Sequence, residues 1–159
     1  MKKIMIFSTI IILLLCMVKE EQVIIPKEAI RFRIIANSNQ EKDQKDKKEV
    51  LKEMTPLLIK VEKEDLSKTK QAIKESLPEF EQILKKKNQN YTIHYGKNYF
   101  PEKEYKNVYY PEGQYDSLVI TLGSGKGENF WCVLFPPLCF LEDDVEYKSI
   151  VKEMIEKYF

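Results

Sequence analysis

The patterns in this chain that could support chemistry are a glycine-rich loop, a single histidine and two acidic residues beside a glycine. Residues 123–127 read Gly-Ser-Gly-Lys-Gly and suggest a phosphate-binding loop at first sight. A P-loop, however, needs Ser or Thr after its lysine, and this chain has Gly127 after Lys126; the first glycine of the motif is also missing. The sequence therefore predicts a turn between two strands rather than a nucleotide site.

The other catalytic candidates lack the partners that their chemistry needs. His94 is the only histidine, and no serine lies in a G-x-S-x-G context that would make it a nucleophile. Glu112 and Asp116 flank Gly113 and are the best candidates for a pair of carboxylates that cleaves glycosides. We predict no catalytic residue, no cofactor and no enzyme activity. An exported cell-wall hydrolase that uses these acidic residues is the alternative.

Size and charge narrow the class of protein further. The chain has 159 residues, enough for one domain with short extensions, and its formal net charge is only +1. Such a balance gives no support for a nucleic-acid partner or for attraction to a membrane surface. We predict that the chain binds no nucleic acid and meets a membrane only through its N-terminus, if that segment is not removed.

The N-terminus has the pattern of an export signal. Met1-Lys2-Lys3 precedes an uncharged apolar run, residues 4–18, whereas a membrane span needs roughly 20 apolar residues. Cys16-Met17-Val18 is a poor cleavage site, so residues 1–19 are either a signal peptide or an uncleaved anchor. We predict export, with residues 20–28 as a mobile tether and residues 29–159 as a single α+β domain.

Residues 129–141 are the most apolar stretch of the predicted domain. They read NFWCVLFPPLCFL, carry no charge and include the only tryptophan, Trp131. Pro136 and Pro137 lack backbone donors and exclude a helix, so we predict a strand over residues 129–135 that turns at the prolines and doubles back. Two interpretations remain open: a core strand, or a segment that is partly exposed for a partner.

Cys132 and Cys139 lie on either side of the two prolines. A chain reversal there could bring their Cα atoms within the roughly 4.4–6.8 Å that a disulfide needs, and an exported protein can keep such a bond oxidised. The alternative is that both are buried free thiols acting as small apolar residues. A metal site is not expected, because His94 is far away in sequence and no second cysteine pair exists.

The rest of the chain alternates between strand and helix patterns. Pro56 falls within the first helical pattern and should kink or divide it, and Ser67 is placed to cap the second. The predicted strands are residues 29–36, 91–95, 105–110, 117–122 and 129–135, and the predicted helices lie within residues 40–63, 67–87 and 145–158.

These elements predict an α+β fold. We expect an antiparallel sheet of four or five strands packed by the two middle helices, plus a short C-terminal helix and the N-terminal apolar leader. Residues 117–122 and 129–135 are joined by the short glycine loop and should pair as a hairpin.

Two segments carry a resemblance to a known family. Residues 30–38, IRFRIIANS, followed by Asp43-Gln44, and residues 131–140, WCVLFPPLCF, resemble the stage II sporulation protein R family. The second segment matches the family signature at all ten positions. The chain departs from the family pattern at Arg33, Asn39 and Phe130, where histidine, an acidic residue and tryptophan are common.

The resemblance implies a signalling protein of endospore-forming bacteria. Such a protein is made in the forespore and exported into the space between the two membranes. There it activates a membrane-embedded aspartic protease of the mother cell, which cuts the inhibitory segment from the sigma-E precursor. The resemblance implies that the signalling protein itself catalyses no reaction.

We predict a partner-binding surface built from the end of the first strand and the proline turn, because a dense apolar cluster bounded by turns often marks a binding patch. Its predicted residues are Asn37, Ser38, Trp131, Phe135, Pro136, Pro137, Leu138 and Phe140.

Overall fold

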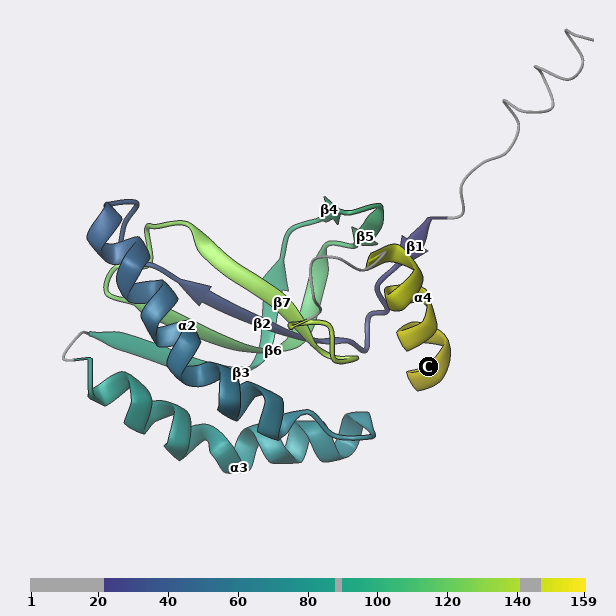
Figure 1. Cartoon of the computed structure of the whole chain (residues 1–159), viewed down its shortest axis with the longest axis horizontal. Coiled ribbons are helices and arrows are strands. Elements are labelled where there is room, and N and C mark those ends of the chain that lie inside the picture. The colour runs from purple at the N-terminus through teal and green to yellow at the C-terminus, as the bar shows by residue number, and fades with distance from the viewer. Residues whose placement is uncertain (1–21, 88–89, 141–146) are drawn as a thin grey trace, which may run out of the picture.

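The computed structural model describes residues 22–87, 90–140 and 147–159 (Figure 1). The predicted leader, residues 1–19, lies outside the described residues. In chain order the elements are β1 (Val23–Ile24), β2 (Ile30–Ile35), α2 (Glu41–Val61), α3 (Leu66–Lys85), β3 (Tyr91–Phe100), β4 (Lys103–Tyr105), β5 (Val108–Tyr110), β6 (Gly113–Leu122), β7 (Asn129–Phe135) and α4 (Tyr147–Tyr158).

A four-stranded sheet is the centre of the fold. Its strand order is β3-β6-β2-β7, with β2 parallel to β6 and the other neighbours antiparallel. The α+β class is confirmed, and the sheet is mixed rather than purely antiparallel. β7 is the edge strand beside β2, and Ile35 lies opposite Asn129 in the register of the two strands.

The predicted hairpin between β6 and β7 is wrong, because β2 lies between these two strands. The glycine loop instead crosses the end of β2. The backbone N–H groups of Lys126 and Gly127 donate to the carbonyl oxygens of Asn37 (3.1 Å) and Ala36 (2.9 Å). An alternating pattern shows which residues share a face of a sheet, but it does not show which strands are neighbours. The hairpin was therefore inferred from the shortness of the glycine loop alone, and that inference gave the wrong pairing.

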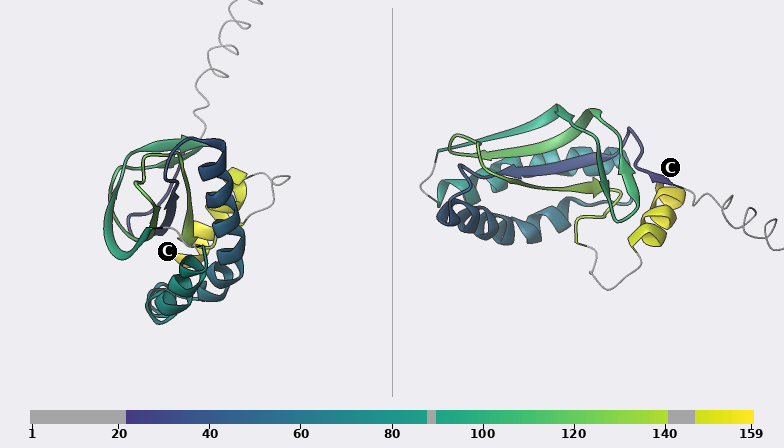
Figure 2. Two further views of the ribbon diagram at one scale, coloured as in Figure 1. Left: turned by 90° about the vertical axis from the view of Figure 1, so that its left-hand side faces the viewer. Right: turned by 90° about the horizontal axis from the view of Figure 1, so that it is seen from above.

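Helices α2 and α3 cover one face of the four-stranded sheet (Figure 2). α2 runs unbroken through Pro56, and the Thr55 hydroxyl donates to the Leu51 carbonyl at 2.9 Å in the preceding turn. α3 is capped by Asp65 rather than Ser67, since the Asp65 carboxylate accepts from the Lys68 N–H at 2.7 Å. The helices and the sheet enclose the main core, which includes Phe32, Ile34, Val50, Met54, Leu58, Ile73, Phe80, Leu118 and Ile120.

A second, three-stranded sheet in the order β1-β5-β4 packs with α4 at one end of the molecule. Lys106 and Asn107 turn the β4–β5 hairpin with positive φ angles of 48° and 62°. Part of the predicted tether is packed on the domain, because β1 pairs with β5 and the side chains of Val23 and Ile25 are buried. None of the helices in the described ranges is long and apolar enough to span a bilayer.

Candidate functional site

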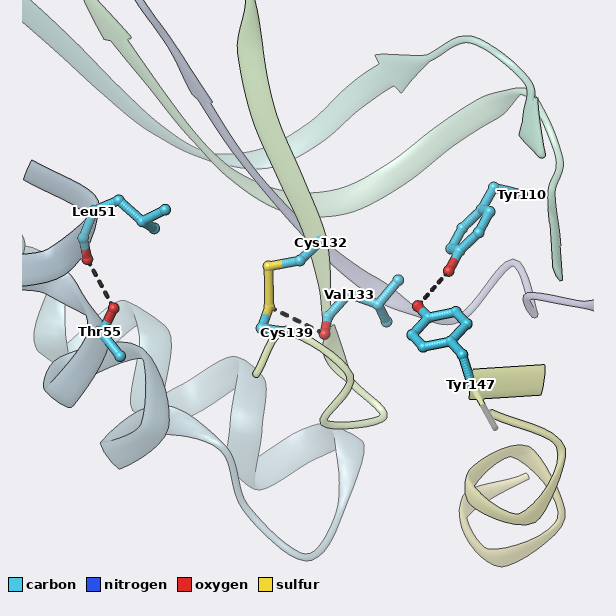
Figure 3. Close-up of a disulfide and its surroundings, with 7 residues drawn as sticks. All are labelled: Leu51, Thr55, Tyr110, Cys132, Val133, Cys139 and Tyr147. Carbon is cyan, nitrogen blue, oxygen red and sulfur yellow. Dashed lines mark hydrogen bonds between the residues drawn. A yellow bond between two sulfur atoms is a disulfide. The ribbon is translucent and has the colours of Figure 1, made fainter. Parts of the chain in front are cut away.

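The apolar segment after the glycine loop forms β7 and a disulfide-closed turn (Figure 3). After the cis Phe135–Pro136 peptide the chain reverses, and the Leu138 N–H donates to the Val133 carbonyl at 3.1 Å. This reversal brings Cys139 back beside the strand. The structure joins it to Cys132 by a disulfide, with the two Cα atoms 5.0 Å apart.

Burial divides the residues predicted for the partner surface into two groups. Phe135, Pro136 and Leu138 are buried, so they belong to the core and offer little to a partner. Trp131 and Pro137 are half-buried, and Phe140 is 37% exposed. The segment is therefore both a core strand and a partly accessible surface, and only its second group can contact another molecule without unfolding.

A groove with a volume of about 600 Å³ lies along β7. The Trp131 ring meets the Tyr110 ring edge to face at 4.7 Å, and the Lys103 ammonium lies 4.8 Å from the Trp131 ring. The Tyr110 and Tyr147 hydroxyls are hydrogen-bonded at 2.6 Å, and burial raises the pKa of both phenols (Figure 3). The groove is lined by Lys103, Tyr105, Lys106, Tyr110, Asn129, Phe130, Trp131, Cys132, Val133, Leu138, Cys139, Phe140 and Tyr147.

The outer edge of β7 borders this groove. β2 is the one strand paired with β7 in the described part of the chain, so the other edge of β7 is open. The proline turn covers this edge at Val133, whose carbonyl accepts the bond from Leu138. Because backbone groups alternate along a strand, Trp131 and Asn129 present their N–H and C=O groups on the same open edge. An extended segment of a partner could pair there.

A polar network holds the loop that follows β2. The Asp43 carboxylate accepts hydrogen bonds from the Ser38 hydroxyl (2.6 Å) and the Asn37 amide (2.8 Å), which lower the pKa of Asp43. The Gln44 amide donates to the Ser38 carbonyl at 2.9 Å. Lys47, itself nearly buried, donates to the Glu128 carbonyl at 2.9 Å. Every one of these groups is occupied by a bond within the chain, so the network positions the loop.

The glycine loop completes this network. Gly127 has no room for a side chain, because a Cβ there would meet the backbone of Ser38 and the Cβ of Ala36. The Glu128 N–H donates to the Asn39 side chain at 2.6 Å. These contacts assign the loop to packing over the end of β2 rather than to phosphate binding.

The structure does not bring the two predicted parts of the partner surface together. Asn37 and Ser38 follow the end of β2 that lies opposite Asn129, whereas the proline turn follows Phe135 at the other end of β7. Six residue steps of a strand separate these ends, or roughly 20 Å. Trp131 lies between these two ends of β7 and borders the groove. Phe140 follows the proline turn and also borders the groove.

The carboxylates considered for catalysis are held apart by different partners. Asp116 forms ion pairs with Lys70 (2.6 Å) and Lys97 (3.3 Å). Partial burial alone would raise the pKa of Asp116, but the hydrogen bonds from these lysines lower it. Glu112 accepts from the Tyr99 hydroxyl at 2.9 Å, and His94 is exposed and lies 3.1 Å from the Asn98 side chain. An ionised, lysine-bound Asp116 is a poor proton donor near neutral pH.

Several residues of the site were not singled out from the sequence. Tyr110, Tyr147 and Lys103 come from elements that flank the groove, and only the tertiary fold brings them to Trp131. Arg31 and Arg33 lie on the face of β2 that points away from the helices and border a smaller cavity beside the groove. They are the only two arginines of the chain, which is the signal that could have found them.

The fold and the site define a small α+β domain with an aromatic and cationic groove beside a disulfide-closed turn. Residues 26–145 match the family described as stage II sporulation protein R. The stage II sporulation protein R of Bacillus subtilis (strain 168) is 39% identical over 149 residues, covering 87% of this chain and 65% of that protein. The chain therefore belongs to the stage II sporulation protein R family. It spans less than two thirds of the length of this relative, and no solved structure matches it.

Proposed function

We propose that this sporulation protein is an exported signal that activates a membrane-embedded aspartic protease, which then processes the sigma-E precursor. Membership of the family supports a role in sporulation. The groove along β7 supports the binding step most directly, because the family signature at residues 131–140 supplies one of its walls.

Activation by such a protein requires differential binding. A ligand shifts a receptor between two states only if it binds one of them more tightly. The open edge of β7 offers backbone bonds to an extended segment, and Trp131 and Phe140 offer apolar contact beside it. In this proposal the protease presents that segment in its active arrangement only, so the messenger stabilises the active state without reacting.

The proposed place of action is the space between forespore and mother cell. The apolar start of the chain and the Cys132–Cys139 disulfide support export, because disulfides persist mainly outside the cytoplasm. The alternative, a cell-wall hydrolase, has less support, since Asp116 is bound by two lysines and Glu112 by Tyr99.

The test is a co-expression assay in a bacterium that does not sporulate. Cells produce this protein, the protease and the sigma-E precursor, and precursor cleavage is followed by immunoblot. We expect cleavage only when all three are present. Cleavage that proceeds equally without this protein would contradict the proposal.

A matched pair of variants tests the groove itself. Phe140→Asp places a charge at its accessible rim, and Ile59→Asp does the same at a 52%-exposed site on α2, away from the groove. We expect Phe140→Asp to reduce cleavage about tenfold or more, as loss of an aromatic anchor does in other interfaces, and Ile59→Asp to leave it unchanged. Phe135 and Leu138 are unsuitable for this test because their burial makes polar substitutions there unfold the domain.

A further inference from the structure

A second, smaller cavity of about 170 Å³ opens beside the groove, and we name it the arginine pocket. It is lined by Arg31 and Arg33 of β2, by Phe100, and by Lys103, Asn129 and Trp131, the last three of which also line the groove. The pocket is thus a side compartment of the proposed partner site. Its two arginines are the only ones in a chain that otherwise uses lysine.

Alternation along β2 places both guanidinium groups on this side of the sheet. Ile30, Phe32 and Ile34 face the main core, so Arg31 and Arg33 face the opposite way. β2 is a central strand with β6 and β7 on its two sides, which keeps its side chains away from solvent. Arg31 is only 1% exposed, which is rare for a charged residue.

Aromatic rings hold the guanidinium groups without neutralising them. The Arg31 guanidinium carbon lies 3.5 Å from the Tyr115 ring centroid and 5.1 Å from that of Phe100, and that of Arg33 lies 4.3 Å from the Phe100 centroid. Each guanidinium also donates to one backbone carbonyl, that of Pro111 for Arg31 and that of Tyr99 for Arg33. The Nε–H of each arginine is buried and has no hydrogen-bond partner among the described residues.

No carboxylate in the described part of the chain lies within ion-pair distance of either arginine. Glu102 borders the pocket, but its carboxylate accepts from the Tyr109 hydroxyl at 2.8 Å. Burial lowers the pKa of both arginines, which is the direction expected for cations without a compensating charge. Buried charges in proteins are normally paired, so the two guanidinium groups are suited to an anion that the described residues do not supply.

We propose that the arginine pocket binds the carboxylate of an acidic side chain on the protein that occupies the groove. This inference rests on the proposed function. Arginine is suited to planar carboxylates, because its N–H groups form a fork that matches two oxygens. A cavity of about 170 Å³ admits such a group but not a nucleotide. Its opening toward Trp131 and the free edge of β7 favours an extended peptide, whose alternate side chains would point to this face.

The test uses the full chain and two peptides that differ at one position, acetyl-Val-Glu-Val-amide and acetyl-Val-Gln-Val-amide, at constant ionic strength. Trp131 is the only tryptophan and lines the pocket, so its fluorescence reports binding directly. We expect a saturable change with the glutamate peptide and a response at least about tenfold weaker with the glutamine peptide. Equal responses to the two peptides, or no saturable response to either, would overturn the inference.

Two variants distinguish binding in the arginine pocket from non-specific attraction of the peptide to positive charge. Arg33→Gln should weaken binding of the glutamate peptide about tenfold or more, whereas Lys52→Gln, an exposed site on α2, should not change it. If Arg33→Gln does not fold by circular dichroism, Arg33→Lys replaces it, and the loss of the fork should still weaken binding. Unchanged binding in a folded Arg33 variant would contradict the assignment.

Inorganic phosphate and vesicles of phosphatidylglycerol serve as competing probes. Tight, saturable binding of either, with no response to the glutamate peptide, would reassign the pocket to phosphate chemistry and overturn the carboxylate proposal. No protease is present in these titrations. A negative titration therefore leaves protease activation standing, and a negative cleavage assay leaves the pocket standing.

Discussion

Asn37 and Ser124, which are 87 residues apart in sequence, are joined by two hydrogen bonds. The Ser124 N–H donates to the Asn37 side-chain oxygen and the Ser124 hydroxyl donates to the Asn37 carbonyl, both at 2.8 Å. The other end of the same side chain donates to Asp43. One amide thus ties the glycine loop, the end of β2 and the first turn of α2 together.

Replacing Asn37 by Ala should destabilise the domain by about 2 kcal/mol, because it removes two side-chain bonds, one of them to an ionised carboxylate. Urea unfolding followed by circular dichroism measures this loss. Asn90→Ala is the control, since Asn90 is exposed and should change stability by less than about 0.5 kcal/mol. Equal effects of the two substitutions would show that the Asn37 network adds nothing.

Gly127→Ala should destabilise the domain by about 2 kcal/mol or more. The added methyl group would overlap the Ser38 backbone, which is held by the Gln44 bond and cannot easily move. Gly96→Ala is the matched control, because the nearest atoms there belong to the exposed His94 ring, which can rotate away. Thermal melting of the two variants compares them. Similar melting temperatures would contradict the close packing of the glycine loop.

Stability should fall as the pH rises from about 4.5 to about 7, through Glu62. Burial raises the pKa of Glu62 from 4.5 to about 7, and one of its carboxylate oxygens has no hydrogen-bond partner in residues 22–87, 90–140 and 147–159. The folded state therefore binds more protons than the unfolded state between these pH values. The stability that protonated Glu62 contributes is complete below about pH 4.5 and is lost as the pH rises to about 7; above that pH, stability no longer changes through Glu62.

Glu62→Gln removes this dependence and should stabilise the domain at pH 8 by an amount of the order of 1 kcal/mol, allowing for partial exposure. The control is Glu64→Gln, whose side chain is 95% exposed. Urea unfolding at pH 5 and pH 8 gives the comparison. A Glu62→Gln variant with the same pH dependence as the wild type would refute the assignment.

Removing the disulfide should lower the stability of the oxidised protein by about 2–3 kcal/mol, as expected for a closed loop of about eight residues. The double variant Cys132→Ala/Cys139→Ala is compared with the wild type in urea, with and without reductant. Reductant should destabilise the wild type only. Insensitivity of the wild type to reductant would mean that the cross-link does not form.

The helices could be predicted from the sequence because apolar residues at three- and four-residue steps identify both the element and its buried face. The cap of α3 was missed by two residues, since Asp65 and Ser67 are both suitable acceptors. The pairing of β6 with β7 failed for a different reason. The position of β2 between them depends on contacts such as Gly127 N–H to Ala36, which no local pattern encodes.

The site was predictable only in part. An uninterrupted apolar run marked β7 and its turn, but it could not show that Phe135 is buried while Phe140 is accessible. The small sheet was missed because β4 is charged and exposed and β1 has only two residues. Without that sheet, Tyr110 of β5 could not be recognised as a neighbour of Arg31.

The packing of β1 restricts how far the domain can travel if the predicted leader is retained as an anchor. β1 starts at Val23, so only three residues separate residue 19 from the folded body, and four Cα–Cα steps reach at most roughly 14 Å. An anchored domain would be confined to a thin layer next to the bilayer, with β1 always toward the lipid. It would meet a membrane-embedded partner by lateral diffusion in the membrane plane. A cleaved chain would lose both the confinement and the fixed orientation.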